Sequence, residues 1–130
     1  MILGIGTDIV SVARMQESMD RWGEERFARR LLSDSEYVLY NQTAAKAHFL
    51  AKRFAGKEAA VKALGTGFRF GLSLKDVQLV NDDLGKPLLK FYGKAAEIAE
   101  DKAVGFTHVS LSDEDAYATA FVVLERINSD

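Results

Sequence analysis

The chain has 130 residues, 48% of them hydrophobic and 28% charged, which is enough for one globular domain with its own core over residues 1–130. A net charge of −2 argues against a broad basic face for nucleic acid, and no apolar run reaches the ~20 residues of a membrane span. The absence of cysteine excludes disulfides and thiolate chemistry and fits a reducing cytoplasm, where we expect the protein to be found.

The N-terminal segment is rich in Ile, Leu and Val but is interrupted by Gly4 and Gly6. Residues 1–10 therefore predict a strand with a bulge or a close backbone approach. Asp8, near its end, is either a buried polar residue bonded to nearby amides or a ligand, because ionised carboxylates are seldom buried without a partner. Ser11 suits an N-cap, and residues 12–22 predict a short helix.

A second helical segment, residues 24–32, is unusually rich in arginine. Arg26, Arg29 and Arg30 lie beside Phe27, and Arg14 on the preceding helix could join them. The pattern fits a solvated basic face, and it fits equally a surface for an acidic partner.

The next segments lead into the longest helix of the chain. Ser33 and Glu36 form a capping-box pattern that opens a helix over residues 34–40, and residues 41–44 form a break. A helix is then predicted over residues 45–64, and Leu50, Phe54, Val61 and Leu64 share its core-facing side.

Charged residues interrupt the apolar side of this helix. Lys57 falls inside it, Glu58 lies at its edge and Lys62 follows one turn later, so we expect these charges to gather around a polar ligand, a metal or water. The alternatives are a solvated ion pair between Glu58 and Lys62 and an outward-reaching Lys57. Gly65 is expected to end the helix in a left-handed conformation.

The second half of the chain changes to strand-like alternation. It predicts two strands, residues 76–81 and 88–92, around a turn that contains Pro87, and then a short helix over residues 94–103. A final hairpin follows, with strands over residues 107–112 and 116–127 and an acidic turn between them. The fold class is therefore α+β, with an antiparallel or mixed sheet packed by helices. In the strand over residues 107–112, His108, Ser110 and Ser112 share one face, which either meets solvent or lines a pocket for a phosphate-bearing ligand.

Three separated segments resemble one family. GIGTDIV at the start, FAGKEAAVKALGTG in the middle and HVSLSD near the end are similar to holo-[acyl-carrier-protein] synthase, the small bacterial type of 4′-phosphopantetheinyl transferase. The resemblance implies that fold and its reaction: a serine of apo acyl carrier protein attacks the β-phosphate of coenzyme A, takes up phosphopantetheine for fatty acid biosynthesis and releases adenosine 3′,5′-bisphosphate. It also implies Mg²⁺ bound by Asp8 and Glu58, which suits an ion that prefers one or two carboxylates together with phosphates.

The same resemblance implies roles for further residues and a homotrimer with sites at the subunit interfaces. Many members of the family carry a second histidine at the position of Asp113, which is assigned no role. The implied sets are Asp8, Glu58 and Lys62 for catalysis; Arg53, Lys57, Gly65, His108 and Ser110 for coenzyme A; and Arg14, Arg26, Phe27 and Arg30 for the carrier protein.

Two other functions remain open at this point. One is a small Mg²⁺-dependent hydrolase of nucleotide pyrophosphates, in which water replaces serine. The other is a module that binds a carrier protein or nucleotide without catalysis. Within the transferase, either Glu58 or Asp8, acting through a metal-bound water, is a reasonable general base.

Overall fold

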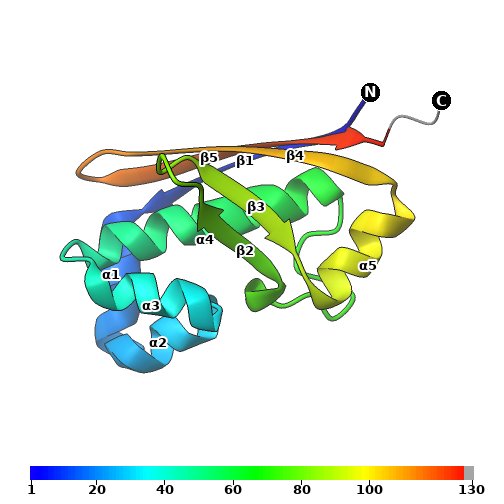
Figure 1. The fold of residues 1–130 in the computed structure, drawn as a ribbon. Helices are drawn as coiled ribbons and strands as arrows, with labels where there is room; N and C mark the ends of the chain where they lie inside the picture. Colours follow the sequence, from blue (N-terminus) through cyan, green and yellow to red (C-terminus); the bar gives the residue numbers. More distant parts are fainter. Residues whose placement is uncertain (128–130) are drawn as a thin grey trace.

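The computed structural model describes residues 1–127, which form a mixed α+β fold (Figure 1). In chain order the elements are β1 (Ile2–Ser11), α1 (Val12–Trp22), α2 (Glu24–Leu31), α3 (Asp34–Gln42), α4 (Lys46–Leu64), the 3-10 turn η1 (Leu74–Asp76), β2 (Val77–Asn81), β3 (Pro87–Phe91), α5 (Gly93–Asp101), β4 (Val104–Asp113) and β5 (Tyr117–Arg126).

The three long strands form an antiparallel sheet in the order β1-β5-β4. The long helix α4 lies against one face of this sheet, and in Figure 1 no described helix or strand covers the opposite face. The strands β2 and β3 form a separate antiparallel pair, and α5 precedes the hairpin β4–β5. The predicted α+β class with antiparallel sheets is therefore confirmed.

Two glycines let β1 lie directly on α4. A Cβ atom added at Gly4 would sit 1.9 Å from the carbonyl oxygen of Ala63, and one at Gly6 would sit 1.8 Å from that of Ala59. Only glycine permits this spacing, because neither contact leaves room for a side chain. The register of β1 also shifts between Ile2 and Gly4, so both the bulge and the close backbone approach predicted for this strand are present.

The helices α1, α2 and α3 pack around the first half of α4. Their shared core is apolar and includes Met15, Met19, Leu31, Tyr40 and Leu50. A second core lies between α4, the sheet, the β2–β3 pair and α5, and contains Val61, Leu64, Leu79, Val122 and Leu124 among others.

Most element boundaries agree with the sequence to within one or two residues. Pro87 differs in the type of element it belongs to: it was expected in the turn, but it is the first residue of β3. A proline at the first position of a strand loses little, because this position need not donate a ladder hydrogen bond. Strand β4 also begins earlier than expected, at Val104 rather than Thr107, because it continues pairing with β5 past a register shift between Val104 and Phe106.

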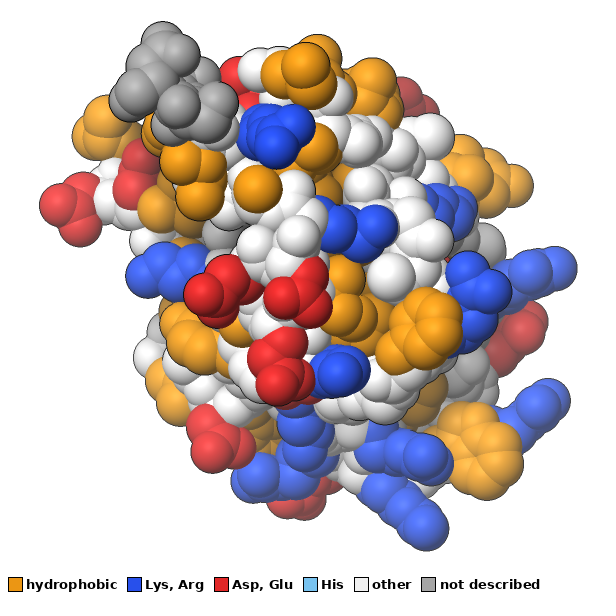
Figure 2. Space-filling view, turned by 90° about the vertical axis from the view of Figure 1, so that its right-hand side faces the viewer, with side chains coloured by type: hydrophobic (Ala, Val, Ile, Leu, Met, Phe, Trp, Pro, Cys, Tyr) orange, Lys and Arg blue, Asp and Glu red, His pale blue; other side chains and the backbone are white. Residues whose placement is uncertain are grey.

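The surface carries charges of both signs. Figure 2 shows the end of the molecule at which α5 lies, where cationic, anionic and apolar side chains all reach the surface. Among the described residues, no helix combines the length and apolarity that a membrane crossing demands.

Candidate active site

The contact between β1 and α4 brings two of the predicted catalytic residues together. The ammonium nitrogen of Lys62 donates to Oδ1 of Asp8 at 2.9 Å and to the carbonyl oxygen of Thr7 at 3.1 Å. Asp8 belongs to the same strand face as Gly4 and Gly6, which explains why its carboxylate points toward α4. The close glycine packing thus sets the distance between the two elements that carry the site.

Glu58, one turn before Lys62, completes the charged group. Burial raises the pKa of Glu58 above its ordinary value of 4.5, the nearby Asp8 carboxylate raises it further, and Lys62 opposes the rise. Two carboxylates close enough to repel each other, with one ammonium group beside them, form a donor set that suits a divalent cation. Asp8 and Glu58 therefore fit Mg²⁺, although the described residues contain no cluster of three or more His, Asp or Glu side chains able to hold a metal.

Both carboxylates lie at one end of a groove that we call the main groove. It has a volume of about 690 Å³ and is walled by β1, α1, α2 and α4. Its other walls carry all four residues predicted to meet the carrier protein: Arg14, Arg26, Phe27 and Arg30. The structure therefore joins the predicted metal ligands and the predicted docking residues in one surface feature, although they come from four separate segments of the sequence.

His108 and Ser110 lie elsewhere. Both are exposed on the outer face of the sheet, as the alternation in β4 predicted, whereas Asp8 is on the face toward α4. His108 Nε2 lies 2.5 Å from Oε1 of Glu125 on the neighbouring strand. Within one chain, these two predicted substrate contacts are thus separated from the carboxylates by the sheet itself.

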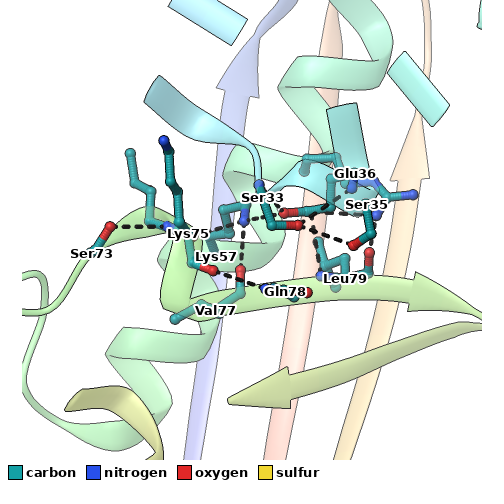
Figure 3. Close-up of polar contacts among 11 residues, drawn as sticks. Ser33, Ser35, Glu36, Lys57, Ser73, Lys75, Val77, Gln78 and Leu79 are labelled. Atoms are coloured by element: carbon teal, nitrogen blue, oxygen red, sulfur yellow. Dashed lines mark hydrogen bonds and ion pairs between the residues drawn. The ribbon is translucent and has the colours of Figure 1, made fainter. Parts of the chain in front are cut away.

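Lys57 does not join the group at the main groove. Its side chain is fully buried, and its ammonium nitrogen donates to Oε1 of Glu36 at 2.7 Å and to the carbonyl oxygens of Leu74 and Val77 at 2.8 and 2.6 Å (Figure 3). The expectation that Lys57, Glu58 and Lys62 gather in one place was therefore wrong. Glu36, from α3, provides a buried partner on the opposite side of the helix.

Arg53 shares this buried cluster. Its guanidinium donates to the carbonyl oxygen of Leu79 and lies 3.4 Å from Oε2 of Glu36, and burial lowers the pKa of both Arg53 and Lys57. Arg53 also lines a second hollow of about 250 Å³, together with Phe49, Lys52, Asn81, Gly85, Pro87 and Leu111. Arg53 therefore joins the buried cluster to a surface depression.

Gly65 ends α4 in the left-handed conformation that the sequence predicted. Its φ is 83° and its amide donates to the carbonyl oxygen of Lys62 at 3.0 Å. No atom lies within 4 Å of the position that a Cβ would take, so the backbone there is open to approach.

Sequence reasoning missed three residues that shape the site. Glu36 was recognised as part of a capping box, but its buried partners come from a distant helix and could not be anticipated. Phe54 packs partly buried against the core, as predicted, but it also lines the main groove, which was not predicted. Trp22, the last residue of α1, also lines this groove. Its place as the single tryptophan on an arginine-bearing helix was the available signal.

Comparison with known proteins identifies the family of the chain. The model of the 4′-phosphopantetheinyl transferase superfamily matches residues 4–122, which include every residue of the proposed site. The chain belongs to this superfamily. A holo-[acyl-carrier-protein] synthase from Pectobacterium atrosepticum is 53% identical over 124 residues, which cover 95% of this chain and 98% of that protein. The recognition from three short motifs is thereby confirmed.

Solved structures of phosphopantetheinyl transferases have the same fold. The holo-[acyl-carrier-protein] synthase of Neisseria meningitidis has a TM-score of 0.89 and 42% identity, covering 97% of this chain and all of that one. The enzyme from Helicobacter pylori, solved in complex with coenzyme A, has a TM-score of 0.81 and 33% identity over 93% of this chain and 99% of its own.

Proposed function

We propose that this phosphopantetheinyl transferase moves 4′-phosphopantetheine from coenzyme A to a serine of apo acyl carrier protein and releases adenosine 3′,5′-bisphosphate. The observation that carries the proposal is the main groove, in which the Asp8 and Glu58 carboxylates share one surface with three arginines. The two carboxylates suit a metal-assisted reaction of a pyrophosphate, and the three arginines suit an acidic protein substrate. We place the reaction in the cytoplasm and in the supply of holo carrier protein for fatty acid biosynthesis.

Asp8 and Glu58 are the residues that would hold Mg²⁺. When bound, this ion neutralises charge on the pyrophosphate oxygens. Lys62, already bonded to Asp8, is placed to keep that carboxylate oriented and to offer its remaining ammonium protons to a phosphate oxygen. The apolar wall formed by Phe54 and Phe27 limits the water that reaches the reacting serine from the groove side.

The outer face of the sheet supports an assembly of several chains. It exposes large apolar side chains, among them Ile9 (63% exposed), Ile5 (55%), Tyr117 (53%) and Phe121 (48%). An apolar face of this kind on a soluble enzyme is typical of a protein interface. The number of copies in the proposed assembly, three, is taken from the resemblance to the family.

The assembly would also explain the position of His108 and Ser110. Both share the outer face with Ile9 and Phe121, so the sheet separates them from the carboxylates of their own chain. In an assembly they could contact coenzyme A bound at the main groove of a neighbouring copy. Arg53, at the second hollow, and Gly65 remain proposed contacts for the same substrate, as does Lys57. For Lys57, contact would require its bonds to Glu36 and two carbonyl groups to open.

The oligomeric part of the proposal is tested by light scattering. The wild type should have three times the mass of one chain, and Phe121→Glu should reduce that mass by placing charges in the apolar interface. A monomeric wild type with full transferase activity would contradict the shared site.

The reaction is tested by the intact mass of an apo acyl carrier protein after incubation with the chain, coenzyme A and Mg²⁺, with a chelator as control. A mass gain equal to phosphopantetheine, absent with chelator, is the expected result. Cleavage of coenzyme A without a mass gain would instead indicate the hydrolase. Unaltered coenzyme A and carrier protein would indicate a binding module.

A further inference from the structure

One face of α1 follows the main groove along its whole length. Ser11, Arg14, Ser18 and Trp22 line the groove at intervals of three or four residues, as one stripe of a helix does. Because a helix rises 1.5 Å per residue, Trp22 lies about 16 Å along α1 from Ser11, at the end remote from Asp8. The groove therefore has an acidic end at β1 and an aromatic end at the end of α1.

Trp22 is unusually accessible for a residue of its type. Its side chain is 56% exposed, although tryptophan is largely buried in most proteins. An exposed large apolar side chain beside polar residues commonly marks an interaction surface. Tryptophan is also among the residue types most enriched at the energetically dominant positions of protein interfaces.

The charges around Trp22 indicate the character of the partner. Arg14, Arg26 and Arg30 line the same groove, and the only acids among its described lining residues, Asp8 and Glu58, lie at the other end. None of the three arginines forms an ion pair with another described residue. Arg14 lies near the start of α1, and Arg26 and Arg30 lie on α2, so the groove offers three guanidinium groups without a described ion pair together with one exposed indole. This set complements an acidic surface that carries an apolar side chain.

We infer that Trp22 is a recognition residue for the carrier protein, with its indole covering an apolar side chain on an acidic surface while the arginines meet the carboxylates. The inference rests on the proposed function, because the partner is the protein whose serine reaches the acidic end of the groove. With that serine at Asp8 and Glu58, the rest of the carrier protein must extend along α1 toward Trp22. Trp22 itself lies too far from the carboxylates to touch the reacting atoms, so it acts on substrate affinity.

The single tryptophan makes this inference directly measurable. Trp22 is the only tryptophan in the chain, so the emission of the protein reports on this indole alone. Titration with an apo acyl carrier protein that lacks tryptophan should shift the emission to shorter wavelength, because the partner removes water from the ring. High salt should reverse the shift if the arginines assist binding.

Kinetics with variants provide the second measurement. Trp22→Ala should raise KM for the carrier protein by about 5- to 30-fold, with kcat and KM for coenzyme A nearly unchanged, and Trp22→Phe should restore part of the affinity. The matched control is Val38→Ala on α3, which changes an equally exposed residue (56%) that does not line the groove and should leave all three constants unaltered.

The outcomes separate this inference from the proposed function. Normal transfer by the wild type, combined with unaltered emission and an unaltered KM in Trp22→Ala, would overturn the role of Trp22 and leave the transferase intact. Absence of transfer by the wild type would overturn the proposed function and, with it, the inference.

Discussion

Replacing Gly6 by alanine tests the packing that builds the site. The added Cβ would lie 1.8 Å from the carbonyl oxygen of Ala59, whereas ordinary van der Waals contacts begin at 3.4 Å, so β1 and α4 would have to separate by about 1.6 Å. The obstacle is backbone, which cannot rotate away as a side chain can. We expect the free energy of unfolding to fall by about 3 kcal/mol, at the upper end of the usual cost of overpacking.

The same displacement should damage catalysis. Asp8 follows Gly6 by two residues on the same strand face, so it would move away from Lys62, which it now contacts at 2.9 Å, and from Glu58. A misplacement of about 1 Å in a catalytic group can cost roughly 100-fold in rate, and we expect a loss of that order in kcat.

Urea denaturation and the initial rate of carrier-protein modification measure the two effects. Gly71→Ala is the control, because its φ of +79° imposes backbone strain but no atom lies within 4 Å of its new Cβ. This variant should lose about 1–2 kcal/mol of stability and keep its kcat. A Gly6→Ala protein with unchanged urea midpoint and unchanged kcat would refute the reasoning.

Three further predictions follow from the charges. Lys57→Met removes the buried ammonium that donates to Glu36 and to two carbonyl groups and leaves Arg53 as the remaining cationic partner of Glu36, so the free energy of unfolding should fall by about 3–5 kcal/mol in urea denaturation. Lost turnover at full stability would instead favour a substrate contact. Because the pKa of Glu58 is raised in the native state, ionisation of Glu58 destabilises the fold as pH rises above 4.5. In the presence of chelator, Glu58→Gln should therefore melt at a higher temperature than the wild type at pH 7, with a gain in stability of less than about 1 kcal/mol, and at the same temperature as the wild type below pH 4. A lower melting temperature of the variant at pH 7 would contradict the like-charge repulsion from Asp8. Finally, KM for the carrier protein should rise several-fold between about 0.05 and 0.5 M salt, because the groove arginines act through screened charges, and a salt-independent KM would count against the docking surface.

Local signals predicted most of the fold. The Ser33 capping box, the left-handed Gly65 and the glycine-broken first strand depend on neighbours within a few residues, and all three are present in the structure. The strand alternation around His108 was equally readable, because side-chain direction in a strand has a period of two.

Long-range partners could not be predicted in the same way. The wheel position of Lys57 indicated burial correctly, but not that Glu36, 21 residues earlier, would be its partner. A helical wheel gives the direction of a side chain and no information about the element that faces it. The motif resemblance named Asp8 and Glu58 together, whereas their place in one groove with the arginines required the packing of β1, α1, α2 and α4.

We propose that Asp8 and Glu58 together bind the Mg²⁺ that transfer requires. The most direct measurement is the Mg²⁺ dependence of the mass gain of apo acyl carrier protein, compared among the wild type, Asp8→Asn, Glu58→Gln and the surface control Lys90→Ala. We predict that each acidic variant needs far more Mg²⁺ and turns over at least 100-fold more slowly at saturation, while the control behaves as the wild type. Unchanged metal dependence and rate in both acidic variants would contradict the account.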